Sequence, residues 1–195
     1  MSSKSPREVT EYRLLFQDTG DQIFRMAWPP TREGFIDAFV KPYVGSAIDA
    51  YCFCTNVAGT SMFYDSKAGE MYGRDRTIFR GGSALRQHEI IKNLCAAGDD
   101  PPRLAVEAAR AAGMDCFLRL RMNDLHDKLH MRCRLDKPSR LPKTWTEEPC
   151  YYMSHFKRQH PELLLGDPNE NLPEKSYEAW EAMAYNYALP SVREM

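Results

Sequence analysis

A cluster of charged and polar side chains directly follows an apolar run near residue 120. Its members are Arg121, Asn123, Asp124, His126 and Asp127. Carboxylate, carboxamide, imidazole and guanidinium groups at one point of a chain can bind substrate hydroxyl groups or hold a proton during its transfer. The structural alternative is that Asn123 or Asp124 caps a short turn and that Arg121 pairs with a nearby acid.

The cluster ends the apolar run 115–122, and three similar runs cover residues 23–28, 47–55 and 182–189. Each run is a predicted β-strand, and ligands meet the carboxyl ends of strands in parallel α/β folds. Planar polar groups bind sugar hydroxyls, and aromatic rings stack on sugar faces. The side chains predicted to bind a substrate at these ends are Arg25, Trp28, Asn56, Arg121, Asn123, Asp124, His126, Asp127, Asn186 and Tyr187. For Trp28 and Tyr187, the alternative interpretation is that their rings pack in the hydrophobic core.

Helices are predicted between these strands. Thr31 can cap a helix whose apolar stripe includes Phe35 and Phe39, a second helix is expected over 84–97, and a third opens at Pro101-Pro102 and closes at Gly113. Residues 56–83 have the composition of an elaborated loop. Strands that alternate with helices predict parallel strands joined by helical crossovers, with the helices on one side if the strand order is sequential.

The composition makes several classes of protein unexpected. Lys and Arg total 26 against 27 Asp and Glu, a net charge of −1, so we expect no nucleic-acid partner. No run approaches the roughly 20 apolar residues of a membrane helix, and the first residues lack the apolar core of a signal peptide. We therefore expect no membrane partner and a cytoplasmic location, with the six cysteines as reduced thiols.

Motifs for cofactors and covalent catalysis are absent from the sequence. No GxGxxG, phosphate-binding GKS or GKT loop, or GxSxG elbow occurs. His126 and His130 are four residues apart with Asp124 nearby, a spacing that would place both imidazoles on one face of a helix. That pair keeps a metal-dependent hydrolase open as an alternative, but we expect neither a metal nor a cofactor.

The stretch 113–127 reads GMDCFLRLRMNDLHD. It resembles the third-strand region of glycoside-hydrolase-like (β/α)8 barrel proteins of bacterial genomes, which carry an RMND-x-HD signature. Residues 186–193, NYALPSVR, are similar to the fourth strand and following helix start of these proteins, and residues 25–28 fit the first unit. The resemblance runs from about residue 22 onward and implies a carbohydrate-active protein with this barrel fold.

The sequence departs from that family in one respect. A later strand with a D-G-[IL]-[ED]-[LF]-D-type end carries acidic residues in such barrels, and this chain has no such strand. A complete barrel needs eight strands and about 250 residues. We therefore expect residues 22–195 to form the N-terminal half of a TIM-barrel-like domain, preceded by an extension at residues 1–21, and copies to associate through exposed sheet edges.

The expected function is that of a fragment of a glycosidase-like hydrolase, which binds sugar hydroxyl groups at the strand ends. Asp124 and Asp127 are too close in sequence to flank a glycosidic bond, so the catalytic residues stay unassigned. One alternative is a non-catalytic sugar-binding or assembly module with the same strand ends. The other is the metal-dependent hydrolase that would use His126 and His130.

Overall fold

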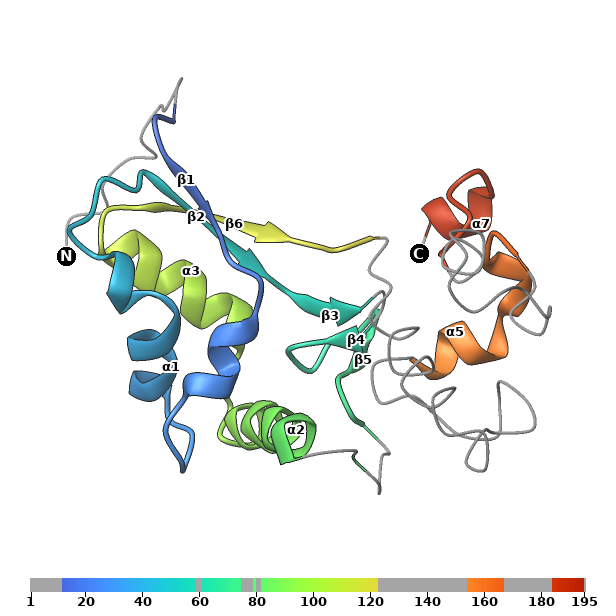
Figure 1. Cartoon of the computed structure of the whole chain (residues 1–195), viewed down its shortest axis with the longest axis horizontal. Coiled ribbons are helices and arrows are strands. Elements are labelled where there is room, and N and C mark those ends of the chain that lie inside the picture. Colours follow the sequence, from blue (N-terminus) through green and yellow to red (C-terminus); the bar gives the residue numbers. More distant parts are fainter. Residues whose placement is uncertain are drawn as a thin grey trace.

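The structure is a computed structural model of the chain, and it describes residues 12–58, 61–74, 79, 82–122, 154–166 and 184–194. The described residues fall into two parts. The body comprises the described residues between 12 and 122. The C-terminal segments comprise residues 154–166 and 184–194. Figure 1 shows the body with its long strands and larger helices, and the C-terminal segments beside it.

The main sheet of the body contains three parallel strands, β1 (Leu15–Gln17), β2 (Ala50–Cys54) and β6 (Asp115–Arg119), in the order β1-β2-β6. Phe16 pairs with Tyr51 between β1 and β2, and Tyr51 pairs with Cys116 between β2 and β6. The order is sequential, and helices lie between the strands in sequence. The prediction of an α/β fold with parallel strands is confirmed, and the described strands form no closed barrel.

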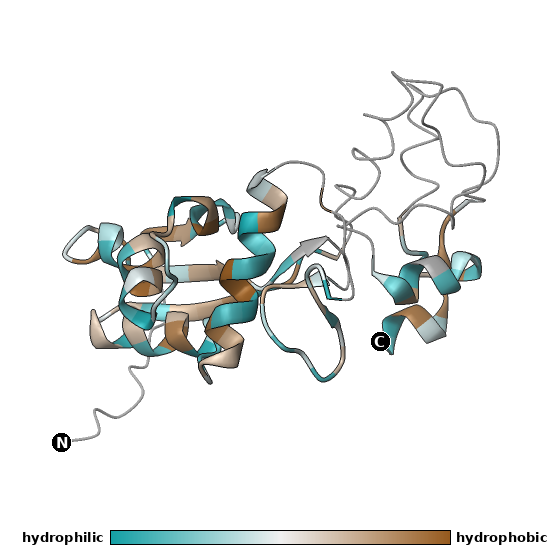
Figure 2. Cartoon of the chain, turned by 90° about the horizontal axis from the view of Figure 1, so that it is seen from below, coloured by the Kyte–Doolittle hydropathy of each residue, from teal (hydrophilic) through white to brown (hydrophobic). Residues whose placement is uncertain are grey.

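Helices α1 (Arg32–Phe39) and α3 (Pro101–Ala111) begin where the sequence predicts them. The Thr31 hydroxyl accepts a hydrogen bond from the Gly34 amide at 3.0 Å, and the Asp100 carboxylate accepts one from the Arg103 amide at 3.2 Å. These caps satisfy amide groups that have no partner within the helix. The third predicted helix is α2 (Gly82–Ala96), and Figure 2 shows that the helices of the body carry both hydrophilic and hydrophobic residues.

The core of the body lies between the sheet and these helices. Phe53 of β2 is 1% exposed and contacts the rings of Phe35 and Phe39 at centroid distances of 5.8 and 5.7 Å. Leu104 and Ala109 of α3 are buried in the same cluster. Figure 1 shows α1 and α3 on one face of the sheet. Burial of these side chains is the main force that holds the helices to the sheet.

A second, smaller sheet follows β2 directly. It consists of β3 (Asn56–Ala58), β4 (Ser61–Met62) and β5 (Glu70–Met71), with β4 antiparallel to β3 and parallel to β5. The C-terminal segments contain α5 (His155–Gln159) and α7 (Pro190–Arg193), and a bridge joins Leu164 to Tyr185. Short 3-10 helices are η1 (Asp21–Arg25), η2 (Lys41–Tyr43) and η4 (Pro161–Leu163).

Two of the predicted strands are wrong. Most of residues 23–28 belongs to or directly follows the 3-10 helix η1, in which Ile23 points into the core. In the described part of 182–189, Tyr185 makes only a single antiparallel bridge, and residues 187 and 188 form a turn. The first strand of the sheet is instead β1, which lies within residues 1–21, the expected extension. The loop predicted over 56–83 contains β3, β4 and β5.

The cysteines of the described residues, Cys52, Cys54, Cys95 and Cys116, are free thiols. Among the described helices, none combines the length and the apolar composition that crossing a bilayer requires.

Candidate sugar-binding face

Side chains alternate between the two faces of the main sheet, and none of the described helices covers one of these faces. We call the face that carries Leu15, Gln17, Cys52, Phe117 and Arg119 the open face. Phe117 is 42% exposed on it, and the ring of Tyr12 meets the Phe117 ring edge-on at 5.5 Å. A pair of partly exposed aromatic rings on a sheet is suited to stacking against a flat apolar surface of a ligand.

Two arginines, Arg119 of β6 and Arg121 just after it, reach toward the carboxyl end of β1. The Arg119 guanidinium donates to the Asp18 carbonyl at 3.4 Å, and the Arg121 guanidinium donates to the Thr19 carbonyl at 2.9 Å. With its carboxamide oxygen turned toward Arg119, Gln17 accepts from both terminal nitrogens at 3.0 and 3.3 Å. Because β2 lies between β1 and β6, both side chains cross its carboxyl end.

Asn56 determines where Arg121 lies. Its carboxamide nitrogen donates to the Arg121 carbonyl at 2.9 Å, and its oxygen accepts from the Arg121 amide at 2.8 Å. This side chain therefore continues the pairing of β2 with β6 beyond the last paired residues, Cys54 and Arg119. Asn56 is 0% exposed, and both ends of its carboxamide bond to the Arg121 backbone, so this side chain positions Arg121.

Two thiols of β2 lie near the arginines. Burial raises the pKa of the Cys52 thiol, and the Arg119 charge opposes this shift. Burial also raises the pKa of the Cys54 thiol, against the opposing charges of Arg121 and Arg119. Both thiols are thus protonated at neutral pH. They act as small packing groups under the guanidinium groups rather than as nucleophiles, because thiolates are the reactive form.

The carboxylate at the end of β1 belongs to the core. Asp18 is 0% exposed, and it accepts hydrogen bonds from the Gly20 amide at 2.7 Å and the Tyr51 hydroxyl at 3.0 Å. Burial raises the pKa of the Asp18 carboxyl, although these hydrogen bonds work in the other direction. Gly20 permits the tight turn through its φ of 84°, a value that residues with a Cβ rarely adopt.

The structure brings together only some of the residues that the sequence predicts for the site. Asn56 and Arg121 are joined directly, and Tyr187 is near them because its hydroxyl donates to the Met122 carbonyl at 2.7 Å. Asn186 accepts from the Ala188 amide and so supports its own turn. Asn123, Asp124, His126 and Asp127 lie outside the described residues.

The first predicted strand, over residues 23–28, is not a strand in the structure, so Arg25 and Trp28 do not lie at a strand end. Arg25 is the exposed last residue of η1, and no described hydrogen bond or ion pair joins its side chain to the open face. Trp28 is 56% exposed and follows η1, and it belongs to no strand.

Four residues of the open face were not singled out from the sequence: Tyr12, Gln17, Phe117 and Arg119. The signal for two of them was the strand periodicity, since Phe117, Arg119 and Arg121 alternate along residues 115–122. Tyr12 and Gln17 had no such signal, because β1 has only three residues. Among the described residues, no group of three or more metal-ligating side chains is gathered in one place.

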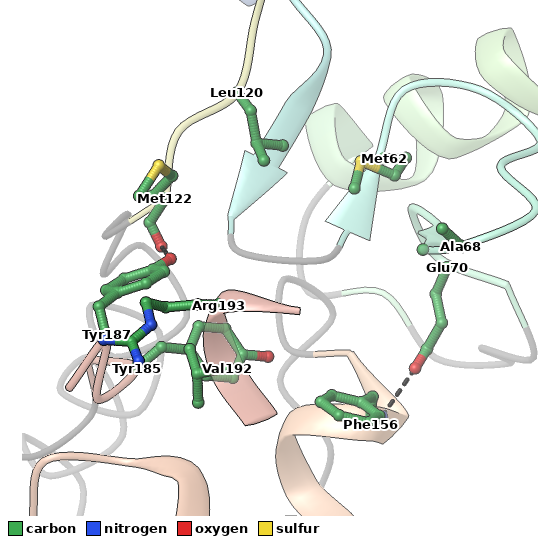
Figure 3. Close-up of a pocket in the computed structure, with 11 residues that line it drawn as sticks. Met62, Ala68, Glu70, Leu120, Met122, Phe156, Tyr185, Tyr187, Val192 and Arg193 are labelled. Atoms are coloured by element: carbon green, nitrogen blue, oxygen red, sulfur yellow. Dashed lines mark hydrogen bonds between the residues drawn. The ribbon is translucent and has the colours of Figure 1, made fainter. Parts of the chain in front are cut away.

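A separate pocket of about 430 Å³ lies between the body and the C-terminal segments, and Figure 3 shows its lining. Leu120 and Met122 line it, and these residues alternate with Arg119 and Arg121 along the chain. Met62 contributes from β4, and the rings of Phe156, Tyr185 and Tyr187 contribute from the C-terminal segments. Residues that alternate along an extended chain point in opposite directions, so the pocket and the arginines are on opposite sides of residues 119–122.

Glu70 joins the two parts of the molecule beside this pocket. Its carboxylate oxygens accept from the His155 and Phe156 amides at 2.8 and 2.7 Å. The Ser154 hydroxyl accepts from the Lys157 amide at 3.1 Å, so the first turn of α5 has two capping side chains. The Glu70 carboxylate, 85 residues before His155 and 86 before Phe156, thus helps to fix the position of α5.

The comparisons with known proteins add no relative. No protein-family model matches this sequence, and no curated protein is significantly similar to it.

Proposed function

We propose that the protein binds a carbohydrate on the open face, at the carboxyl ends of β1, β2 and β6. The observation that carries the proposal is the crossing of the arginines over β2 next to the Phe117 ring. A sugar ring presents hydroxyl groups at its edge and C–H groups on its face. Guanidinium donors suit the hydroxyl groups, and an aromatic ring suits the C–H face.

The dimensions of the open face support this proposal. Phe117 and Arg119 are two residues apart on β6, which corresponds to about 6.6 Å along a strand. That spacing lets one sugar ring contact both side chains. A guanidinium has five N–H donors. Arg119 contacts Gln17 and the Asp18 carbonyl through its terminal nitrogens, which leaves further N–H groups for a hydroxyl.

The strand arrangement supports a finer part of the proposal. Three parallel strands in sequential order with helices on one face match the winding of a (β/α)8 barrel. We therefore assign β1, β2 and β6 to the N-terminal half of such a barrel, with β3, β4 and β5 as an insertion after β2. In this assignment the open face corresponds to the inside of the barrel.

Binding without hydrolysis is the function that the described residues support best. Glycosidases of most families need two carboxyl groups on either side of the bond. Asp18, the carboxylate at the end of β1, faces Tyr51 in the core instead of the open face. Hydrolysis, the sequence-based hypothesis, is therefore the alternative function. It would require carboxylates outside the described residues, and Asp124 or Asp127 can supply at most one of the pair, because the two are too close in sequence to flank the bond.

The test is a binding screen with two variants and a control. Saturation-transfer NMR with neutral mono- and disaccharides identifies a ligand, and calorimetry then measures its affinity. We expect Arg119→Met and Phe117→Ala each to weaken binding about tenfold, the size of one lost charged hydrogen bond or stacking contact. Arg110→Met, at an exposed position of α3, is the matched control and should bind normally. A screen without any binding sugar, or binding that neither variant changes, would refute the proposal.

A reducing-end assay on the ligand separates the two functions. Binding without release of new reducing ends supports a sugar-binding module. Release of reducing ends that Asp124→Asn abolishes supports the hydrolase, and binding on the open face would then serve that reaction.

A further inference from the structure

We propose that the pocket between the body and the C-terminal segments is a second binding site, for a small aromatic carboxylate. This proposal does not rest on sugar binding, because the pocket and the open face are on opposite sides of residues 119–122. Its volume of about 430 Å³ is within the range of small-molecule sites, roughly 300–1,000 Å³. Such sites are mostly apolar, with a few polar groups that orient the ligand.

The walls of the pocket fit a flat apolar group. Tyr185 and Tyr187 line one part, and Phe156 of α5 lines another. Met62, Leu120 and Met122 contribute flexible side chains, and thioether groups adapt well to aromatic rings. Leu120 and Met122 are about half exposed in the structure, which is a costly arrangement for apolar side chains in water. A bound ring would cover both of them.

The charges at the pocket specify an anion. The Arg193 guanidinium lines the pocket and takes part in no ion pair or side-chain hydrogen bond with the described residues. Glu70, the other charged lining residue, is already bound to the two amides of α5. In Figure 3 Arg193 is next to Tyr187, whereas Glu70 is on the side of Phe156. A ligand with its ring between the aromatic side chains can therefore place a carboxylate at Arg193 and keep it away from Glu70.

The Tyr187 phenol adds little polarity to this surface. The Tyr187 hydroxyl donates a hydrogen bond to the Met122 carbonyl at 2.7 Å, and burial raises the pKa of this phenol. The phenol of Tyr187 therefore stays neutral and contributes its ring to the pocket wall. A sugar, which needs many hydrogen-bonding partners, fits this pocket less well than the open face.

The experiment uses 2-naphthoate as the probe and 2-naphthalenemethanol as its neutral match, with naphthalene fluorescence as the readout on the full chain. We expect 2-naphthoate to bind with one site per chain and about tenfold more tightly than the alcohol, the gain from one charge-assisted contact. Arg193→Gln should reduce the affinity for 2-naphthoate to that for the alcohol. Arg110→Gln, on the exposed part of α3, is the matched control and should leave both affinities unchanged.

Two variants test the location. Ala68→Phe and Leu120→Trp each place a larger ring into the pocket from an exposed position, so neither creates a cavity in the core. Either variant should abolish binding of both probes while circular dichroism stays as in the wild type. Equal affinities for the acid and the alcohol would overturn the proposal. So would unchanged binding in Arg193→Gln, or in a folded Ala68→Phe or Leu120→Trp variant.

Discussion

The body and the C-terminal segments are held together by different means. In the body, the cluster around Phe53 and Leu104 joins a three-stranded sheet to three helices. In the C-terminal segments, the buried cluster consists of Leu164, Tyr185 and Val192. The larger cluster removes much more apolar surface from water, and it does so within one sheet-and-helix unit. The smaller cluster lies in segments that hydrogen bonds join to the body, among them those from the α5 amides to Glu70.

We infer from this difference that the open face is held more rigidly than the pocket. The open face belongs to a sheet whose other face packs against α1 and α3. This packing fixes the backbone that carries the side chains of the open face. The pocket has one wall in each part, so its shape depends on how firmly α5 is held. Local stability of this kind varies across a protein and can be measured separately for each part.

The largest effect is expected for Phe53→Ala, which removes a ring from the center of the body. Phe53 is 1% exposed between Phe35 and Phe39, so the variant should lose about 3–5 kcal/mol of unfolding free energy. Urea denaturation followed by circular dichroism measures this loss. A loss below about 1 kcal/mol would mean that the body does not depend on this cluster.

Leu164→Ala makes the corresponding change in the C-terminal segments. Leu164 is buried in the small cluster, and we expect a loss of about 2 kcal/mol that is confined to this part. Hydrogen exchange should accelerate at the amides of Leu165 and Asn186, which bond to the Ala184 and Leu163 carbonyls. The amides of β2 should not change. Faster exchange of the β2 amides as well would show that the two parts unfold as one unit, which contradicts separate stabilities for the body and the C-terminal segments.

Glu70→Gln tests the link between the parts. The substitution keeps one acceptor for the amides of α5 but removes the charge, and we expect a loss of about 1 kcal/mol at α5. Hydrogen exchange at the His155 and Phe156 amides reports it. Glu107→Gln is the control, because Glu107 is exposed and its ion pairs with described residues, to Arg32 and Arg103, are near 4 Å. Equal exchange in both variants would show that Glu70 does not hold α5.

The smallest effect is a change in the pH dependence of the body. Burial raises the folded-state pKa of Asp18, so its contribution to stability is complete below the unfolded pKa of about 3.9 and is lost as pH rises through the folded pKa. We therefore expect Asp18→Asn to gain stability relative to the wild type between pH 4 and pH 7.5. Urea denaturation across this range measures the difference.

Asp49 provides the opposite case on the same sheet. Hydrogen bonds from the Leu14 and Arg13 amides lower the pKa of the Asp49 carboxyl. Its contribution is present above the unfolded pKa and is lost as pH falls through the folded pKa. Asp49→Asn should therefore lose stability relative to the wild type as pH rises, and a shift of the same sign in both variants would contradict the assignment.

The parts that could be predicted from the sequence are those with local signals. Thr31 and the pair Pro101-Pro102 mark helix starts, and the apolar runs of β2 and β6 mark buried strands. β1 could not be predicted, because distant residues hold it: β2 pairs with its three residues, and the Asp49 carboxylate binds the amides of Arg13 and Leu14 just before it. Residues 23–28 have a strand-like composition, but Ile23 and Met26 fill the core from a 3-10 helix and the residue after it.

The candidate site divides in the same way. Arg121 and Asn56 could be predicted because both stand at the end of an apolar run. The role of Asn56 could not, since its two hydrogen bonds to Arg121 join residues 65 positions apart. The pocket could not be predicted for the same reason. Its walls come from segments that are far apart in the sequence, and no local pattern connects them.

Cys52 gives the open face a chemical reporter of its own. Its half-buried thiol lies next to the Arg119 charge and stays protonated at neutral pH, so alkylation by iodoacetamide should be slow and should accelerate in alkaline buffer. A molecule that settles over Arg119 and Phe117 also shields that sulfur from the reagent. Mass spectrometry of the Cys52 peptide would then register occupancy without any label on the ligand.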